Sequence, residues 1–180
     1  MDPVVSRYAQ DILDSEEMQL EKQIPHHGKV SCFEHSLAVA ETAAAIARKL
    51  KKPIDMASLV RGALLHDFYL YDWHVADPSH RLHGLFHAEK ALRNAEKRFR
   101  LNEIEKDIIR KHMFPLNLPF PLYPESWIVT LADKICTWRD FKKNRAEKKA
   151  LRAEKKAQKN ARRKKEKDAR EKPRGKNERP

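Results

Sequence analysis

The chain has 180 residues, of which 41% are hydrophobic, and its formal net charge is +12. This length is enough for one domain with a sizeable hydrophobic core. No apolar segment is long enough to cross a bilayer and the N-terminus lacks the hydrophobic region of a signal peptide, so the sequence excludes an integral membrane protein. The two cysteines, Cys32 and Cys136, form no CxxC motif, which favours a reducing compartment. We therefore expect a cytoplasmic protein that does not bind membranes.

The positive charge is concentrated at the C-terminal end of the chain. Residues 141–180 contain 19 Lys/Arg and 6 Asp/Glu, a net charge of +13, whereas residues 1–140 contain 19 Lys/Arg and 20 Asp/Glu, a net charge of −1. After Phe141 there is no further aromatic residue, and Leu151 is the only large apolar one. The sequence therefore predicts three segments: an N-terminal helix that packs on the core (1–28), a globular domain (29–141) and a basic low-complexity tail (142–180).

The tail has too little apolar surface to join a hydrophobic core. It repeats the hexapeptide RAEKKA at 145–150 and 152–157, and its alanines recur at helical spacing. We expect a mobile or singly helical arm whose Lys and Arg side chains contact RNA or DNA without sequence selectivity. A purely solubilising extension is the alternative.

The elements predicted in chain order are all helices. The chain has only four glycines, no Asn-Gly or Asp-Gly turn and no alternating β-branched run, so the pattern predicts an all-α helical bundle. Caps are expected at Ser31, Asp55 and Asn102, and the segments 25–28 and 114–124 should interrupt helices. The predicted helices cover about residues 3–22, 32–51, 56–67, 85–100, 103–113 and 125–138. Residues 71–84 read as a loop that can line a site.

An ionisable pair, His66-Asp67, ends the apolar run Ala63-Leu64-Leu65. A buried carboxylate is costly unless it is paired or holds a metal ion. Further His and Asp residues lie on otherwise apolar helix faces, and any one of them alone is more often an ordinary core residue than a ligand. The complete set places six metal-type ligands on five predicted helices: His35, His66, Asp67, His87, His112 and Asp133. Bundles build dinuclear sites from inward-facing His and carboxylate groups in this way.

Adjacent residues of a helix point about 100° apart, so His66 and Asp67 cannot both face one buried ion squarely. The geometry is easier if Asp67 bridges two ions, the histidines divide between them, and Asp133 completes the shell of the first. Imidazole and carboxylate ligands suit divalent Fe, Mn, Zn, Co or Ni more than Ca or Mg. The absence of a thiolate argues against a structural zinc site.

The order H…HD…H…H…D over about residues 29–141 resembles the HD-domain superfamily of metal-dependent phosphohydrolases, whose dinuclear members are helical. The resemblance implies two metal ions, Fe or Mn first, and hydrolysis of a phosphate ester by metal-bound hydroxide with Asp67 as the shared ligand. The segments FYLYDWH, FHAEKALRNA, DIIRKHMFP and LADK are similar to those of short bacterial HD hydrolases. The segment LADKICTWRDF also resembles the end of bacterial symmetrical diadenosine tetraphosphate hydrolases.

The sequence departs from two groups of this superfamily, and each departure bears on the substrate. The HD-GYP phosphodiesterases carry His-His-Glu and a Gly-Tyr-Pro turn, whereas this chain has His112-Met113-Phe114 and a proline-rich segment, which argues against cyclic-di-GMP as substrate. The diadenosine tetraphosphate hydrolases usually follow HD with a tyrosine and a nearby lysine, whereas Phe68 follows here. The substrate therefore stays open among nucleotides and other phosphate esters.

The third histidine of the family pattern has two candidates, His83 and His87. His87 is preferred because Ala91 follows four residues later and the gap to His112 fits the family. His83, His80 and His74 are then either residues that contact the ligands or substrate phosphate, or exposed loop histidines. His26 and His27 are expected at the surface.

Two basic residues near Asp133 complete the predicted site. Lys134 and Arg139 are candidates to neutralise substrate phosphate, with Arg61 as a weaker one, and Lys134 reads equally well as a helix-surface lysine. Two other functions stay open: a di-iron oxygenase of the HD fold, which shares the ligand set, and a nucleic-acid-binding protein with a degenerate HD domain. Six intact ligands argue against the second.

Overall fold

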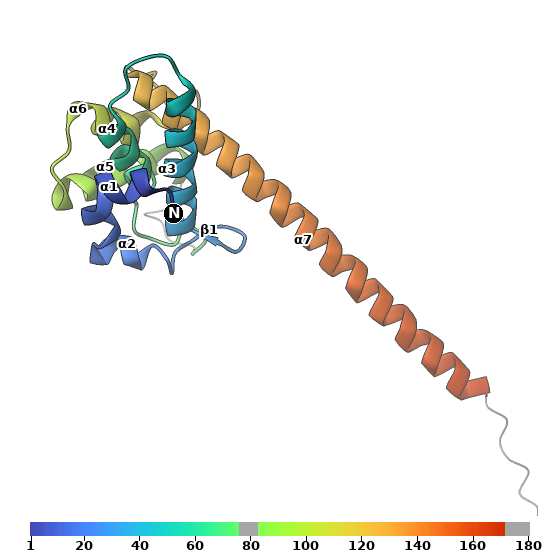
Figure 1. The fold of residues 1–180 in the computed structure, drawn as a ribbon. Coiled ribbons are helices and arrows are strands. Elements are labelled where there is room, and N and C mark those ends of the chain that lie inside the picture. The colour runs from blue at the N-terminus through green and yellow to red at the C-terminus, as the bar shows by residue number, and fades with distance from the viewer. Residues whose placement is uncertain (76–82, 172–180) are drawn as a thin grey trace, which may run out of the picture. The chain divides into compact units, whose positions relative to one another are not determined.

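The computed structural model describes residues 1–75 and 83–171. The chain divides into two compact units, residues 1–141 and residues 142–180. The first unit is helical (Figure 1), which confirms the predicted fold class. Its helices are α1 (Pro3–Leu13), α2 (Glu16–Leu20), α3 (Cys32–Lys49), α4 (Met56–Leu65), α5 (His83–Arg98), α6 (Glu103–Lys111) and the beginning of α7 (Pro124–Glu171).

Side-chain caps fix where the helices begin. The Ser31 hydroxyl accepts a hydrogen bond from the Glu34 N–H at 3.2 Å, and the Glu34 carboxylate accepts one from the Ser31 N–H at 2.9 Å. Asn102 and Glu105 form the same reciprocal pair at the start of α6. Asp55 caps α4 as expected. The single N-terminal helix predicted over 3–22 was wrong, because Ser15 caps a separate helix α2.

A short antiparallel hairpin joins α2 to α3. Its strands are β1 (Pro25–His27) and β2 (Val30–Ser31), at the place where the sequence predicted only a break. Gly28 supplies the turn with a φ of 68°, a conformation that glycine adopts without steric cost. The register pairs Pro25 with Ser31 and His27 with Val30, so His26 is an extra, bulged residue of β1.

Helix α4 lies at the centre of the first unit, in contact with α1, α3 and α6. Its buried side chains Leu59, Val60, Leu64 and Leu65 form much of the hydrophobic core. The facing side of α3 is rich in alanine, which lets the two helix backbones approach closely. This packing holds the C-terminal end of α4 in place.

Gly62 is the point of closest approach between α4 and α6. A Cβ atom built on Gly62 would lie 2.6 Å from Cδ1 and 2.9 Å from Cβ of Ile108. The second distance involves an atom next to the backbone of α6, so a rotamer change cannot relieve it. Glycine is therefore required here by packing.

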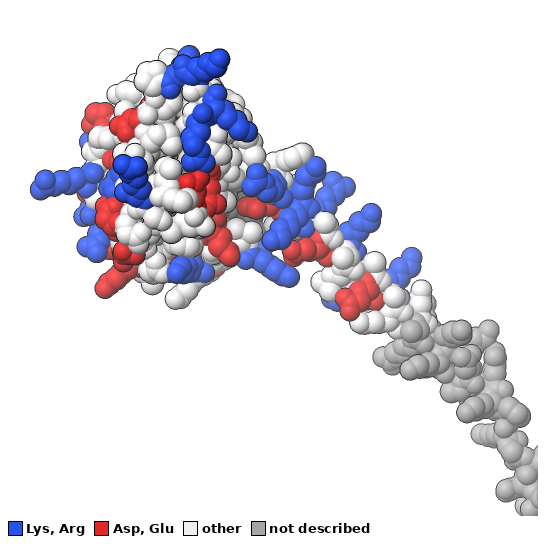
Figure 2. Space-filling model, in the orientation of Figure 1, with Lys and Arg blue, Asp and Glu red and all other residues white. Residues whose placement is uncertain are grey.

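The second unit, residues 142–180, contains the rest of α7 up to Glu171. Residues 142–160 contain nine Lys/Arg and two Asp/Glu, and almost all of them are exposed. Lys and Arg side chains predominate along this segment in Figure 2. In the described part of the chain, no helix combines the length and hydropathy that a membrane span needs.

Gly62→Ala should destabilise the protein by about 1–3 kcal/mol, the usual cost of inserting a methyl group into a filled core. Thermal unfolding measures it. The control is Gly84→Ala in α5, where an added Cβ would meet only a Leu116 side chain at 4.0 Å and should be neutral or slightly stabilising. Ile108→Val removes the nearest atom and should recover part of the loss; equal stability of the two Gly→Ala variants would contradict the packing argument.

Candidate metal centre

The turn after α4 directs the pair His66-Asp67 into the bundle. α4 ends at Leu65, His66 keeps helical dihedral angles, and Asp67 lies in the turn that follows. Leu70 then adopts a φ of 58°, which turns the chain away from the helix axis. The turn, rather than a continuing helix, therefore sets the direction of the Asp67 carboxylate.

Four other helices supply the remaining candidate ligands. His35 lies near the start of α3, His87 in the first half of α5, His112 at the C-cap of α6 and Asp133 in α7. All are buried, as are His66 and Asp67. The structure brings together the six side chains singled out in the sequence: His35, His66, Asp67, His87, His112 and Asp133.

One oxygen of Asp67 belongs to a first donor group, which we call the α5/α6 group: Asp67 Oδ1, His87 and His112. The distances are 3.3 Å from Oδ1 to His87 Nε2, 3.6 Å from Oδ1 to His112 Nε2, and 3.0 Å between the two nitrogens. Ligands about 2.1 Å from one metal ion lie roughly 3.0 Å apart at 90° and roughly 3.4 Å apart at tetrahedral angles. The three atoms therefore have the spacing of ligands to a single ion.

The other oxygen of Asp67 belongs to a second donor group, the α3/α7 group: Asp67 Oδ2, His35, His66 and Asp133. His35 Nε2 lies 3.2 Å from Asp133 Oδ1. His66 Nε2 lies 3.4 Å from Asp67 Oδ2 and 3.9 Å from Asp133 Oδ1. The two oxygens of one carboxylate thus face two separate sets of donors.

Backbone carbonyls fix the tautomers of two histidines. His66 Nδ1 lies 2.7 Å from the Ala63 carbonyl and His112 Nδ1 lies 2.8 Å from the Ile109 carbonyl. A carbonyl only accepts, so each Nδ1 carries the proton and each Nε2 presents a lone pair to the cluster. Among the described side chains, His66 Nε2 and Asp67 Oδ1 are buried atoms without a hydrogen-bond partner. Such atoms are costly unless they bind something, so the residues fit bound metal ions.

The charges of the cluster follow from its pKa shifts. Burial opposes protonation of His35, but Asp133 and Asp140 at its two ring nitrogens outweigh burial and raise its pKa to about 9. Burial and the neighbouring His66 lower the pKa of His112 to about 3. A divalent cation bound here would therefore displace the proton of His35, while His112 is already neutral.

The two central carboxylates are ionised despite burial. Burial alone would raise the pKa of Asp67, but the neighbouring imidazoles of His66, His26 and His87 outweigh burial and hold it well below its usual range. The pKa of Asp133 is likewise lowered, because the hydrogen bond from His35 outweighs burial. The cluster therefore carries the negative charge that a cation site needs.

Two residues near the cluster were not predicted from the sequence. His26, expected at the surface, is 7% exposed, and its Nε2 lies 3.1 Å from Asp67 Oδ2, so that prediction was wrong. Nothing in the helical periodicity marks it, because it lies on a hairpin. Asp140 lies 3.4 Å from His35 Nδ1 and orients that ring. Its position two helical turns after Asp133 is a signal that could have found it.

Several predicted residues lie outside the cluster. The Lys134 ammonium donates to the Phe114 carbonyl at 2.6 Å. Arg139 is exposed, and no hydrogen bond or ion pair joins it to the cluster among the described residues. Arg61, the weaker phosphate candidate, pairs with Asp11 and Glu105 and ties α1, α4 and α6 together.

The other loop histidines are only partly described. His74 is half exposed, with its Nδ1 2.9 Å from Asp72. His80 lies outside the described residues. His83 begins α5, but the structure does not describe its side chain, nor that of His27.

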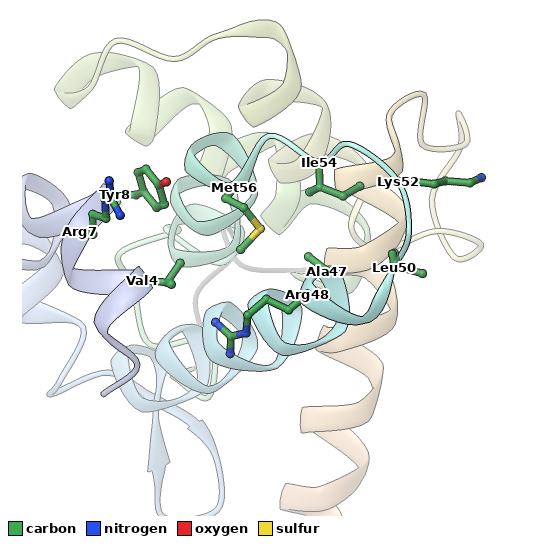
Figure 3. Close-up of a pocket in the computed structure, with 9 residues that line it drawn as sticks. All are labelled: Val4, Arg7, Tyr8, Ala47, Arg48, Leu50, Lys52, Ile54 and Met56. Carbon is green, nitrogen blue, oxygen red and sulfur yellow. The ribbon is translucent and has the colours of Figure 1, made fainter.

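A separate hollow of about 330 Å³ is lined by residues of α1, α3, α4 and the segment 50–54 (Figure 3). Arg7, Arg48 and Lys52 give its rim a positive charge. Arg48 donates to Asp2 at 2.6 Å, and Lys52 points outward in the figure. None of the six cluster residues lines this hollow.

The first unit is thus a helical bundle that encloses a buried cluster of imidazole and carboxylate groups able to hold a metal ion. A family model for the HD domain matches residues 32–138, more than half of the chain. The chain therefore belongs to the HD domain family, and the resemblance inferred from the sequence is confirmed at this level. No curated protein and no solved structure matches the chain.

His87→Ala should lower the metal content of the purified protein more than His83→Ala, because His87 Nε2 lies among the donors of the α5/α6 group. Elemental analysis of the two variants, prepared side by side with wild type, measures the difference. The reverse order would mean that His83 is the ligand and that the preference for His87 is wrong.

Proposed function

We propose that the protein is a metal-dependent phosphohydrolase of the HD superfamily that acts on a nucleotide or another phosphate ester. Two divalent ions would be held by the two donor groups: one by Asp67 Oδ2, His35, His66 and Asp133, the other by Asp67 Oδ1, His87 and His112. The observation that carries the proposal is the Asp67 carboxylate, whose two oxygens face different sets of donors. This arrangement suits a bridging ligand.

The donor chemistry favours transition metals. The donors are imidazole nitrogens and carboxylate oxygens, which suit Fe and Mn, and also Zn, Co or Ni, better than Ca. The two thiols are engaged elsewhere: Cys32 Sγ lies 2.9 Å from the Tyr69 hydroxyl and Cys136 Sγ lies 3.4 Å from the Thr42 hydroxyl. Bound ions would supply an activated water molecule and polarise a phosphoryl oxygen, so no Ser or Cys nucleophile is required.

The residues of this chain position the reaction. Asp67 joins the α5/α6 group to the α3/α7 group, since each group contains one of its two oxygens. The Ala63 and Ile109 carbonyls accept from Nδ1 of His66 and His112 and so direct each Nε2 toward the cluster, and Asp140 orients His35. Three of the histidine ligands are therefore held by a second contact, as in well-ordered metal centres.

Substrate phosphate requires cationic partners at the rim of the cluster, and we propose Lys134 and Arg139 for this role. The Lys134 ammonium binds a neutral backbone carbonyl, and burial lowers its pKa. Exchange of that carbonyl for an anionic phosphate oxygen would form a stronger, charge-assisted hydrogen bond. Arg139 is exposed on the same helix and offers a second cationic group.

Asp67→Ala should remove both ions while the protein keeps its helical circular-dichroism spectrum, because both donor groups lose an oxygen. The matched control Asp72→Ala removes a nearby carboxylate outside the two groups and should keep both ions. The measurement is metal analysis of anaerobically purified protein. Background occupancy in wild type would remove the basis of the proposal.

With Mn or Fe supplied, wild type should release phosphate or a nucleoside monophosphate from a member of a broad phosphate-ester screen, and Asp67→Ala should not. The bound ions would supply the activated water, and Asp67 is the donor that both groups share. A blank screen together with O₂ consumption in the presence of an organic substrate would favour the di-iron oxygenase alternative.

We also propose that the basic tail, residues 142–180, binds RNA or DNA. Residues 142–180 carry far more Lys/Arg than Asp/Glu and have no aromatic residue to stack on bases, so binding should be electrostatic and non-selective. The alternative of a nucleic-acid-binding protein with a degenerate HD domain is disfavoured, because all six donors are present and meet.

Truncation after Lys143 should abolish most nucleic-acid binding at low salt while leaving metal content and turnover of small substrates intact. Every proposed ligand precedes residue 134, so the tail contributes no donor. Titrations of a labelled oligonucleotide at several salt concentrations should show a steep salt dependence for the full chain only. Loss of metal in the truncated protein would mean that the tail belongs to the folded site.

A further inference from the structure

His26 reaches the cluster from outside the helical bundle. It belongs to β1, is buried, and lies 41 residues before Asp67 in the sequence, yet its Nε2 lies 3.1 Å from Asp67 Oδ2. Its ring stacks on that of His35, with 3.9 Å between ring centroids and 21° between ring planes. A histidine expected at the surface is thus packed against two of the residues proposed as ligands.

The backbone at His26 is shaped to produce this contact. His26 is the bulged residue of the hairpin, since its neighbours Pro25 and His27 pair with adjacent residues of β2. A β-bulge redirects the side chain of the extra residue, and bulges are frequent next to active sites. The adjoining turn at Gly28, with a φ of 68°, reverses the chain immediately afterwards. The local fold therefore aims the imidazole at Asp67.

The distance has the value expected for two ligands of one ion. Ligands about 2.1 Å from a metal are roughly 3.0–3.4 Å apart, and His26 Nε2 is 3.1 Å from Asp67 Oδ2. His66 Nε2 lies at 3.4 Å from the same oxygen. His26 and His35 also belong, with Asp140, to a set of donor atoms that all lie within 4.8 Å of one another. The imidazole therefore lies on the α3/α7 side of the bridging carboxylate.

We propose that His26 is a fifth protein ligand of the ion held by the α3/α7 group. This inference rests on the two-ion centre proposed above. The ion would then have five protein donors: His26, His35, His66, Asp67 and Asp133. The ion of the α5/α6 group has three: Asp67, His87 and His112.

The difference in donor number assigns different roles to the two ions. A six-coordinate ion with five protein ligands keeps one position for water or substrate, whereas an ion with three protein ligands keeps up to three. The α5/α6 group, with three protein donors, would therefore leave room for a phosphate group on its ion. The α3/α7 group, with His26 added, would mainly anchor its ion.

The competing role for His26 is a hydrogen bond to Asp67 without metal coordination. Removing such an outer-shell partner costs about 10–100-fold in metal affinity. His26→Gln keeps an N–H donor of similar reach but loses the imidazole, so it separates the two roles. His74→Ala, which removes a half-exposed histidine paired with Asp72, is the control.

The experiment uses the full chain loaded with Co²⁺, whose visible absorption reports coordination number, together with chelator competition for affinity. Wild type should bind two ions. His26→Ala and His26→Gln should both weaken one of them by more than about 100-fold, the upper end of an outer-shell effect, and change the Co²⁺ spectrum. His74→Ala should match wild type, and circular dichroism verifies that each variant is folded.

Three results would overturn the inference. A His26→Gln variant with the wild-type spectrum and an affinity within 10-fold would make His26 a hydrogen-bond donor to Asp67 only. A third ion in wild type that is lost in His26→Ala would place His26 in a separate site with His35 and Asp140. Failure of wild type to bind Co²⁺ would overturn the two-ion centre itself. The wild-type measurement alone distinguishes this result from a failure of the His26 proposal.

Discussion

The buried carboxylate of Asp67 is the constraint on which the rest of the structure depends. Its side chain is about 6% exposed and is ionised, and an isolated ionised carboxylate in such a place would cost many kcal/mol. Imidazoles at the ends of α4 and α6, in α5 and in the hairpin offset this cost, and all lie within 3.6 Å of the two Asp67 oxygens. The close packing of α4 on α3 and α6, with Gly62 against Ile108, places the carboxylate where these rings meet.

The histidine rings of the cluster are held by nearby backbone carbonyls as well as by contacts between helices. His66 and His112 each donate to the carbonyl three residues earlier, at the end of a helix. This bond needs only that the helix stop at the histidine, and both helices do. The same local device, used twice, gives two rings a defined tautomer without any further residue. His35 instead depends on a long-range partner, Asp140.

Helix periodicity and capping made much of this fold predictable. The capping boxes at Ser31 and Asn102 follow from short sequence patterns, and the ordered His and Asp residues on apolar faces predicted which side chains would meet. That these residues bind metal stays a prediction. Ser15 was missed because its cap divides a segment whose apolar pattern is continuous. His26 could not be assigned because its position depends on a β-bulge, which has no local sequence pattern. Asp140 was missed although it lies two helical turns after Asp133, because its role depends on a contact between α3 and α7.

Both α4 and α6 meet the cluster with their C-terminal ends, where the helix dipole carries partial negative charge. Together with the ionised Asp67 and Asp133, these ends make the centre attractive to cations and repulsive to anions. An anionic phosphate ester would therefore be rejected until positive charge has been added. For the proposed phosphohydrolase this implies an order of assembly, in which the cations would enter first and the anionic substrate would follow only onto the loaded centre.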